Sequence, residues 1–71
     1  MNLEVGKHYR IIFENGSKIA GELTDIKRIG SEIYSLWIDI GRQPVYIAYR
    51  EVKELVQIDN YEEDWRANSL N

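Results

Sequence analysis

Hydrophobic and polar residues alternate with a period of two near the start of the chain, which is the pattern of a half-buried β-strand. In HYRIIFE (8–14), one face of such a strand carries Tyr9, Ile11 and Phe13. Asn15-Gly16 follows, and both residue types tolerate the positive φ that a tight hairpin turn requires. The pattern therefore predicts a strand over 8–14 that reverses at Asn15-Gly16.

The return strand is predicted over SKIAGELTDI (17–26), where Ile19 and Leu23 lie in phase. Gly21 stands between them on the same face. A glycine inside a strand weakens it and usually marks a bulge, a bend or the close approach of another backbone. We therefore expect the second strand to bend at Gly21, as strands do when a small sheet curls into a barrel.

A loop is expected at KRIGS (27–31), before EIYSLWIDI (32–40), the most apolar segment of the chain. Both faces of this predicted strand are apolar, with Leu36, Ile38 and Ile40 on one face and Ile33 and Trp37 on the other. Both apolar faces must be shielded from solvent, so the strand is either central in the fold or has one face against another subunit. We expect Tyr34 and Trp37 to belong to the core, because large aromatic side chains supply much of the burial in a small domain.

Two further strands complete the pattern. GRQP (41–44) predicts a turn, with Pro44 beside the start of the strand VYIAYR (45–50). A short connection at Arg50-Glu51 leads into the last strand, VKELVQI (52–58). Five strands joined by short turns within about 50 residues predict an all-β fold, a small, strongly bent five-stranded barrel over residues 1–58.

The remaining segment, 59–71, is an acidic and aromatic C-terminal tail. Asn60 followed three positions later by Glu63 resembles a helix N-cap with its capping partner, which predicts a short helix or a single turn. Tyr61 and Trp65 are four residues apart and would share one helix face. We interpret that face as a contact that caps the barrel or meets a neighbouring subunit, and anchoring of a protein partner is the alternative.

Length and composition limit how this domain is stabilised. A chain of 71 residues buries only about 60% of its unfolded surface, so its core is marginal without further support. The sequence has no cysteine and one histidine, which excludes disulfides and a zinc site built from thiolates or several histidines. Homo-oligomerisation or unusually good packing remains. No apolar run approaches the roughly 20 residues of a membrane span, and the N-terminus has no signal pattern, so a cytoplasmic location is expected.

Charge is distributed unevenly along the chain. Residues 1–58 hold eight cationic and eight anionic side chains, so the tail contributes the whole net charge of −3. The strongly basic surface that usually accompanies nucleic-acid binding is therefore absent. Local cations remain in Lys27-Arg28, in the predicted loop, and in Arg42, in the predicted turn.

The five-strand pattern resembles the Sm-like family. IFENGSKIAGELTDI is similar to the first Sm motif, in which an apolar strand runs to a turn glycine and into a bent strand with its own glycine. VYIAYREVKELVQI resembles the second motif, where a fourth strand turns tightly into a fifth. The resemblance covers about 50 of the residues, and the SH3-like barrel, which has the same order of strands and turns, is the rival interpretation.

The resemblance implies a ring of copies joined through their fourth and fifth strands. It also implies that RNA or nucleotide bases bind between the loop after the second strand and the turn before the fifth. Lys27 and Ser31 occupy loop positions where the family usually has Asp and Asn, and AYRE stands in place of its Arg-Gly signature. A small nucleotide suits a neutral barrel at least as well as RNA does, because fewer phosphates need to be neutralised.

The candidate ligand-binding residues come from these two segments. They are Lys27, Arg28, Ser31, Tyr49 and Arg50. An aromatic ring beside a guanidinium can stack on a base and pair with its phosphate, and two cations with a hydroxyl can hold a phosphate. The competing interpretation is structural: a tyrosine packed at a strand end, an arginine paired with Glu51 or Glu54, and a solvated loop.

No arrangement of residues predicts catalysis, a metal site or a cofactor. Serine, histidine and carboxylates occur without a catalytic, EF-hand or P-loop spacing. The sequence therefore predicts a non-enzymatic, homo-oligomeric binding protein for RNA or a small nucleotide, such as one that sequesters a nucleotide signal. The rival hypothesis is an SH3-like protein–protein adaptor that uses its aromatic tail.

Overall fold

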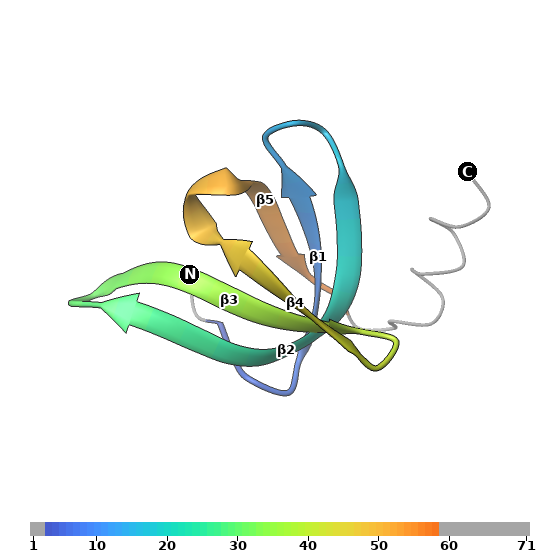
Figure 1. Cartoon of the computed structure of the whole chain (residues 1–71), viewed down its shortest axis with the longest axis horizontal. Coiled ribbons are helices and arrows are strands. Elements are labelled where there is room, and N and C mark those ends of the chain that lie inside the picture. Colours follow the sequence, from blue (N-terminus) through green and yellow to red (C-terminus); the bar gives the residue numbers. More distant parts are fainter. Residues whose placement is uncertain (1–2, 59–71) are drawn as a thin grey trace.

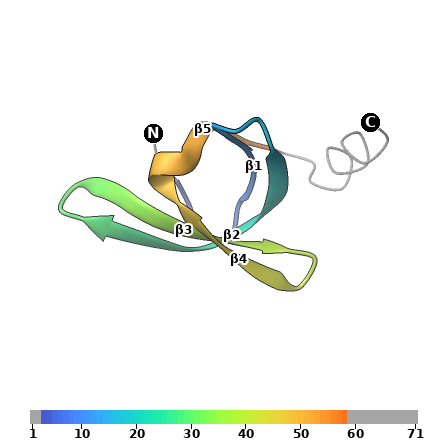
Figure 2. The ribbon, with the colours of Figure 1, turned by 45° about the horizontal axis from the view of Figure 1, so that its top comes forward.

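The computed structural model describes residues 3–58, which form one antiparallel sheet and a short 3-10 helix (Figure 1). In chain order the elements are β1 (His8–Phe13), β2 (Lys18–Ile29), β3 (Glu32–Ile40), β4 (Gln43–Ala48), η1 (Tyr49–Glu51) and β5 (Val52–Gln57). The strand order across the sheet is β4-β3-β2-β1-β5. Figure 2 shows this sheet curling into a small barrel. The predicted all-β, five-stranded fold is confirmed.

The sequence predictions for the tail fall outside this description. The proposed helix, the Tyr61 and Trp65 contacts and the whole of 59–71 lie beyond the described residues. Residues 3–58 include every strand that the alternating pattern predicted.

One apolar cluster fills the concave side of the sheet. Its buried members are Leu3, Tyr9, Ile11, Leu23, Leu36, Ile38, Ile47 and Leu55. β1 and β3 each contribute two alternate residues to the cluster, as the period of two predicts, and β2, β4 and β5 contribute one each. The N-terminal segment closes one end of it, since the Glu4 amide donates to the Tyr9 hydroxyl (3.0 Å) and the Gly6 amide to the Leu23 carbonyl (2.8 Å).

At Gly21 the backbone of β3 occupies the space that a side chain on β2 would need. A Cβ atom at Gly21 would overlap the Asp39 carbonyl oxygen and lie 2.6 Å from Cγ2 of Ile38. Glycine is therefore needed because a neighbouring backbone occupies the space of a side chain. The β2–β3 register then shifts between Leu23 and Asp25, and β2 curves strongly beyond this point (Figure 1). The predicted close approach at Gly21 is confirmed, and the predicted bend of β2 lies just beyond Gly21.

The first turn differs in detail from its prediction. Phe13 accepts a hydrogen bond from the Gly16 amide (2.9 Å) and donates one to the Ser17 carbonyl (2.9 Å), so the loop spans three residues, 14–16. Only Gly16 has positive φ (90°). Asn15 instead accepts hydrogen bonds through Oδ1 from the amide and hydroxyl of Ser17 (2.9 and 2.7 Å). Asn15 stabilises the turn through its side chain and not through its backbone conformation.

The two following hairpins have two-residue turns. Ile29 pairs with Glu32 across the first of them, in which Gly30 has a φ of +64°. In the second, Gly41 and Arg42 both have positive φ (54° and 73°), as a type I′ turn requires. The prediction of a loop over 27–31 is therefore wrong. Residues 27–29 continue β2, because their pairing with β3 extends until a turn of only two residues is left.

The fourth strand also differs from its prediction. It begins at Gln43 and ends at Ala48, so Pro44 lies inside it, paired with Asp39. Tyr49 and Arg50 belong to η1, which the Val52 amide closes by donating to the Tyr49 carbonyl. β4 and β5 are consecutive in the chain yet lie at opposite edges of the sheet. Pro44 is compatible with such an edge because it lacks an amide hydrogen to donate.

Candidate ligand-binding site

Two adjoining hollows lie where the β2–β3 hairpin, β4 and η1 come together. The first, of about 230 Å³, is lined by Ile33, Tyr34, Tyr46, Ala48 and Arg50. The second, of about 400 Å³, is lined by Arg28, Ser31, Glu32, Ile33 and Tyr49. We call them the tyrosine hollow and the arginine hollow. Ile33 lines both, so the two hollows lie next to each other at the start of β3.

Strand register explains why these residues meet. Ser35 pairs with Ala48, and Trp37 with Tyr46, which brings the start of β3 beside the end of β4. Arg28 pairs with Ile33 on the other side of β3. η1 then turns back against β3 and presents consecutive residues to the two hollows, Tyr49 to one and Arg50 to the other. The site thus combines three segments that lie apart in the sequence.

The cations at the site are exposed. Among residues 3–58, the side chains of Arg28 and Arg50 form no salt bridge, so the sequence-based alternative that pairs Arg50 with Glu51 or Glu54 is not observed. Glu32 is the acidic residue that lines the arginine hollow. The Lys27 Nζ lies 5.5 Å from the centre of the Tyr34 ring, within the range of a cation–π contact. Two guanidinium groups therefore remain available to an anionic ligand.

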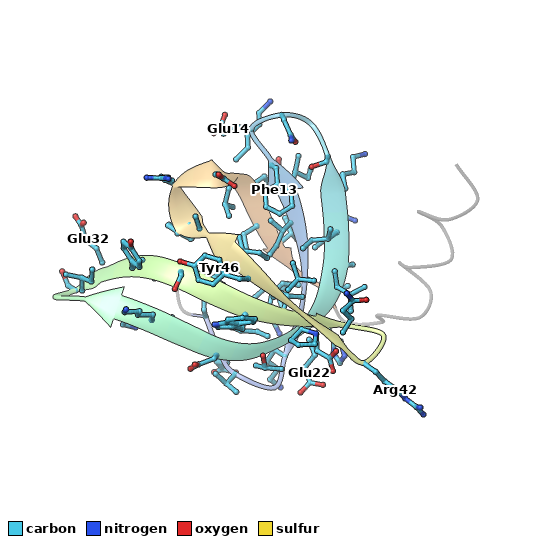
Figure 3. All side chains as sticks on the ribbon, viewed as in Figure 1. Phe13, Glu14, Glu22, Glu32, Arg42 and Tyr46 are labelled. Atoms are coloured by element: carbon cyan, nitrogen blue, oxygen red, sulfur yellow. The ribbon has the colours of Figure 1, made fainter. Side chains whose placement is uncertain are left out.

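The aromatic side chains form an outward-facing cluster instead of core. Tyr34 is 52% exposed, Tyr46 51% and Trp37 38%. The Trp37 and Tyr46 rings meet edge to face with their centroids 5.4 Å apart. Figure 3 shows Tyr46 in front of the β3–β4 pair. The prediction that Tyr34 and Trp37 are core residues is wrong, because the concave face is already filled by aliphatic residues and Tyr9.

The structure brings the predicted site residues close to one another. Arg28, Ser31 and Tyr49 line the arginine hollow, and Arg50 lines the tyrosine hollow. Lys27 lines neither, but it contacts the ring of Tyr34, which does. Prediction from sequence missed Tyr34 and Tyr46 as site residues. The two-residue turn after Ile40 was the available signal, because it places Tyr46 directly across from Trp37.

Other kinds of site are not found in the described part of the chain. Residues 3–58 bring together no group of three or more His, Cys, Asp or Glu side chains that would hold a metal ion. No helix within that range is long and apolar enough to cross a membrane. Comparisons with protein-family models, with curated proteins and with solved structures find no match to this chain. The geometry of the two hollows is therefore the basis for a functional proposal.

Proposed function

We propose that this protein is a non-enzymatic binding protein that holds a nucleotide-containing ligand, a small nucleotide or a nucleotide unit of RNA, across the tyrosine and arginine hollows. The observation that supports the proposal is that exposed tyrosines lie near Ile33 together with arginines that form no salt bridge within residues 3–58. A nucleotide combines a flat ring with an anionic phosphate, and the two hollows offer a matching group for each.

In this proposal each hollow has a distinct role. The base stacks on Tyr46 or Tyr34, where stacking of a base on an aromatic ring contributes about 1–3 kcal/mol. Arg50 borders the same hollow and reaches the sugar-phosphate. Arg28 and the Ser31 hydroxyl bind the phosphate in the arginine hollow, through charge-assisted hydrogen bonds that are stronger than neutral ones.

The charge balance favours a ligand with few phosphates. Lys27, Arg28 and Arg50 supply the cations near the site, and Glu32 opposes them. Residues 1–58 as a whole carry no net charge. A long single strand would need a continuous basic groove, whereas one or two phosphates need only the arginines at the site.

We further propose that copies assemble in the Sm-like manner, with β4 of one copy beside β5 of the next. Both are edge strands, and an edge strand offers unpaired backbone groups to another chain. Tyr46 and Ala48 lie on β4, so a neighbour paired there would stand beside the tyrosine hollow. The ligand would then bind between subunits.

Substitution of the two arginines tests the ligand site. Arg28→Ala and Arg50→Ala are each expected to weaken binding of a nucleoside monophosphate by about 10- to 100-fold, because each removes a hydrogen bond to a charged group, a loss of about 1.5–3 kcal/mol. Isothermal titration calorimetry with adenosine and uridine monophosphates and with a short single-stranded oligouridine measures the affinity. Arg42→Ala is the matched control, since Arg42 is exposed in the β3–β4 turn. Equal affinity in all three variants contradicts the assignment.

The exposed Trp37–Tyr46 pair supports a second candidate, a protein–protein adaptor. Exposed aromatic side chains are frequent anchors of protein interfaces. The two functions respond differently to substitution. Trp37→Ala with both arginines intact should spare phosphate binding but abolish a protein partnership at this face, whereas Tyr61→Ala with Trp65→Ala tests an adaptor that acts through its tail.

A further inference from the structure

The convex face of the sheet carries a second set of apolar residues. Arg10 of β1 pairs with Ala20 on β2 and with Val56 on β5. Because paired residues share a face, these side chains lie opposite the core face of Ile11. Ala20 is only 1% exposed, although it is not part of the apolar cluster on the concave side. Ala20 is therefore covered by neighbouring groups, unlike Lys18 and Glu22, which are exposed on the same face of β2.

The neighbouring convex positions extend this surface. Ile12 follows Arg10 on β1 with the same orientation, and Ile58 lies just after the end of β5, two residues beyond Val56. Both are half-buried, as is Val56, and none of the three packs against the concave cluster. The convex patch is therefore defined by Ile12, Ala20, Val56 and Ile58 around the Arg10 side chain, with Lys18, Glu22 and Glu54 at its borders.

The chain leaves the described fold at this patch. The Ile58 amide donates to the His8 carbonyl (3.0 Å), which ties the last described residue beside the start of β1. Thirteen residues follow it. Their length reaches about 20 Å as a helix, and a three-strand face is only about 10 Å wide between its outer strands. The tail is thus attached at the edge of the patch and long enough to cover it.

The tail supplies aromatic side chains for the apolar residues of the patch and carboxylates for Arg10. Tyr61 and Trp65 have the spacing of neighbours on one helix face. Four carboxylates, at positions 59 and 62–64, accompany them against a single cation, Arg66. We propose that residues 59–71 dock on the convex patch, with Tyr61 and Trp65 against Ala20 and Val56 and with an acidic side chain of the tail paired with Arg10.

A nitroxide on the convex face tests this docking in the full chain. The sequence has no cysteine, so Glu22→Cys, beside Ala20 on an exposed position, accepts a single spin label. The chain has two tryptophans, and Trp65→Phe assigns their indole N–H signals. The Trp65 signal is expected to lose most of its intensity in the labelled protein. Ser31→Cys is the matched control, because it labels the far tip of the β2–β3 hairpin (Figure 1).

Each outcome decides the proposal. Broadening of Trp65 by the Glu22 label and not by the Ser31 label supports docking on the convex patch. An unaffected Trp65 signal overturns it. A mixed sample shows whether the tail docks on its own copy or on another. It combines spin-labelled protein without isotope enrichment and nitrogen-15 protein without a spin label. Broadening of the Trp65 signal in this mixture overturns the proposal, because the tail would then cover a second copy.

A charge reversal provides an independent check of the same contact. Arg10→Glu should restore the Trp65 signal in the protein labelled at Glu22→Cys, because the reversed charge repels the acidic tail. Arg28→Glu makes the same change at the far tip of the hairpin and should leave the broadening intact. Equal effects of the two reversals would mean that Arg10 does not hold the tail, and the pairing would be rejected.

Discussion

At the scale of single residues, Arg42 has a backbone conformation that is unfavourable for a residue with a Cβ atom. Its φ of 73° lies in the left-handed region, where a residue with a Cβ atom costs roughly 1–2 kcal/mol. The conformation persists because a two-residue turn of type I′ needs positive φ at both positions. Gly41 meets that need without strain, and Arg42 does not. The cost is intrinsic to the backbone and not to any contact of the arginine side chain.

Arg42→Gly is therefore expected to stabilise the protein, even though it deletes a long side chain. The gain should be about 0.5–1 kcal/mol, since the relief of left-handed strain exceeds the extra chain entropy of glycine in the unfolded state. Urea denaturation measures the free energy of unfolding. Arg42→Ala removes the same side chain and keeps the strain, so it should give no gain. An equal gain from both variants would show that the charge, and not the backbone, is responsible.

At the scale of the elements, β2 determines the shape of the sheet. It pairs with β1 through its first part and with β3 through the rest, and the two ladders meet at Glu22, next to Gly21. The missing Cβ lets the Asp39 backbone lie against β2. A side chain there would push β3 away, and the hairpin that forms the candidate site would move with it.

Gly21→Ala should lower the free energy of unfolding by at least about 1–3 kcal/mol, the usual cost of overpacking, because the obstructing atom belongs to a backbone. The same variant should weaken ligand binding, since β3 carries Ile33 and Tyr34. Thermal unfolding and calorimetry report the two effects. Gly16→Asn is the control: nothing lies within 4 Å of its added Cβ, and asparagine tolerates positive φ. A Gly21→Ala protein as stable as the Gly16→Asn protein would disprove the steric account.

The alternation of residues predicts these elements better than it predicts their surroundings. The faces of β1 and the special role of Gly21 follow from local sequence, because period and glycine placement act over a few residues. The length of β2 does not follow from local sequence. Lys27 and Arg28 are consecutive polar residues without apolar–polar alternation, and only their pairing with β3 places them in a strand. Tyr34 and Trp37 are exposed for a similar reason: which apolar face is covered depends on the whole sheet.

The candidate site, like the strands, was only partly predictable from the sequence. Arg28 and Arg50 stand 22 positions apart, and a resemblance to a family, not their spacing, suggested that they meet. Tyr46 lies at the site because it pairs with Trp37, and this register depends on the length of the Gly41-Arg42 turn. Residue types thus indicated the chemistry of the site, and the pairing of strands determined which residues share it.

At the scale of the whole molecule, β4 and β5 are the two edge strands of the sheet, where the proposed assembly would join copies. We expect native mass spectrometry to show a closed oligomer, with added nucleotide mass when the protein is purified gently. Amides of β4 should exchange with deuterium more slowly at high protein concentration than at low, while those of β1, which is paired on both sides, should not change. A monomer at every concentration would remove the intersubunit part of the proposed function.

The strand order also has a consequence for the path of folding. The β1–β2, β2–β3 and β3–β4 hairpins each join neighbouring segments, so their loops close early and cheaply. The β1–β5 ladder instead joins Ile11 to Leu55, almost the full span of the fold. Such distant pairing slows folding because the entropy of closing a long loop is lost before its contacts form. Attachment of β5 is then the natural last step, and until residue 57 is available a nascent chain holds three finished hairpins with β1, in place of β5, as an exposed edge.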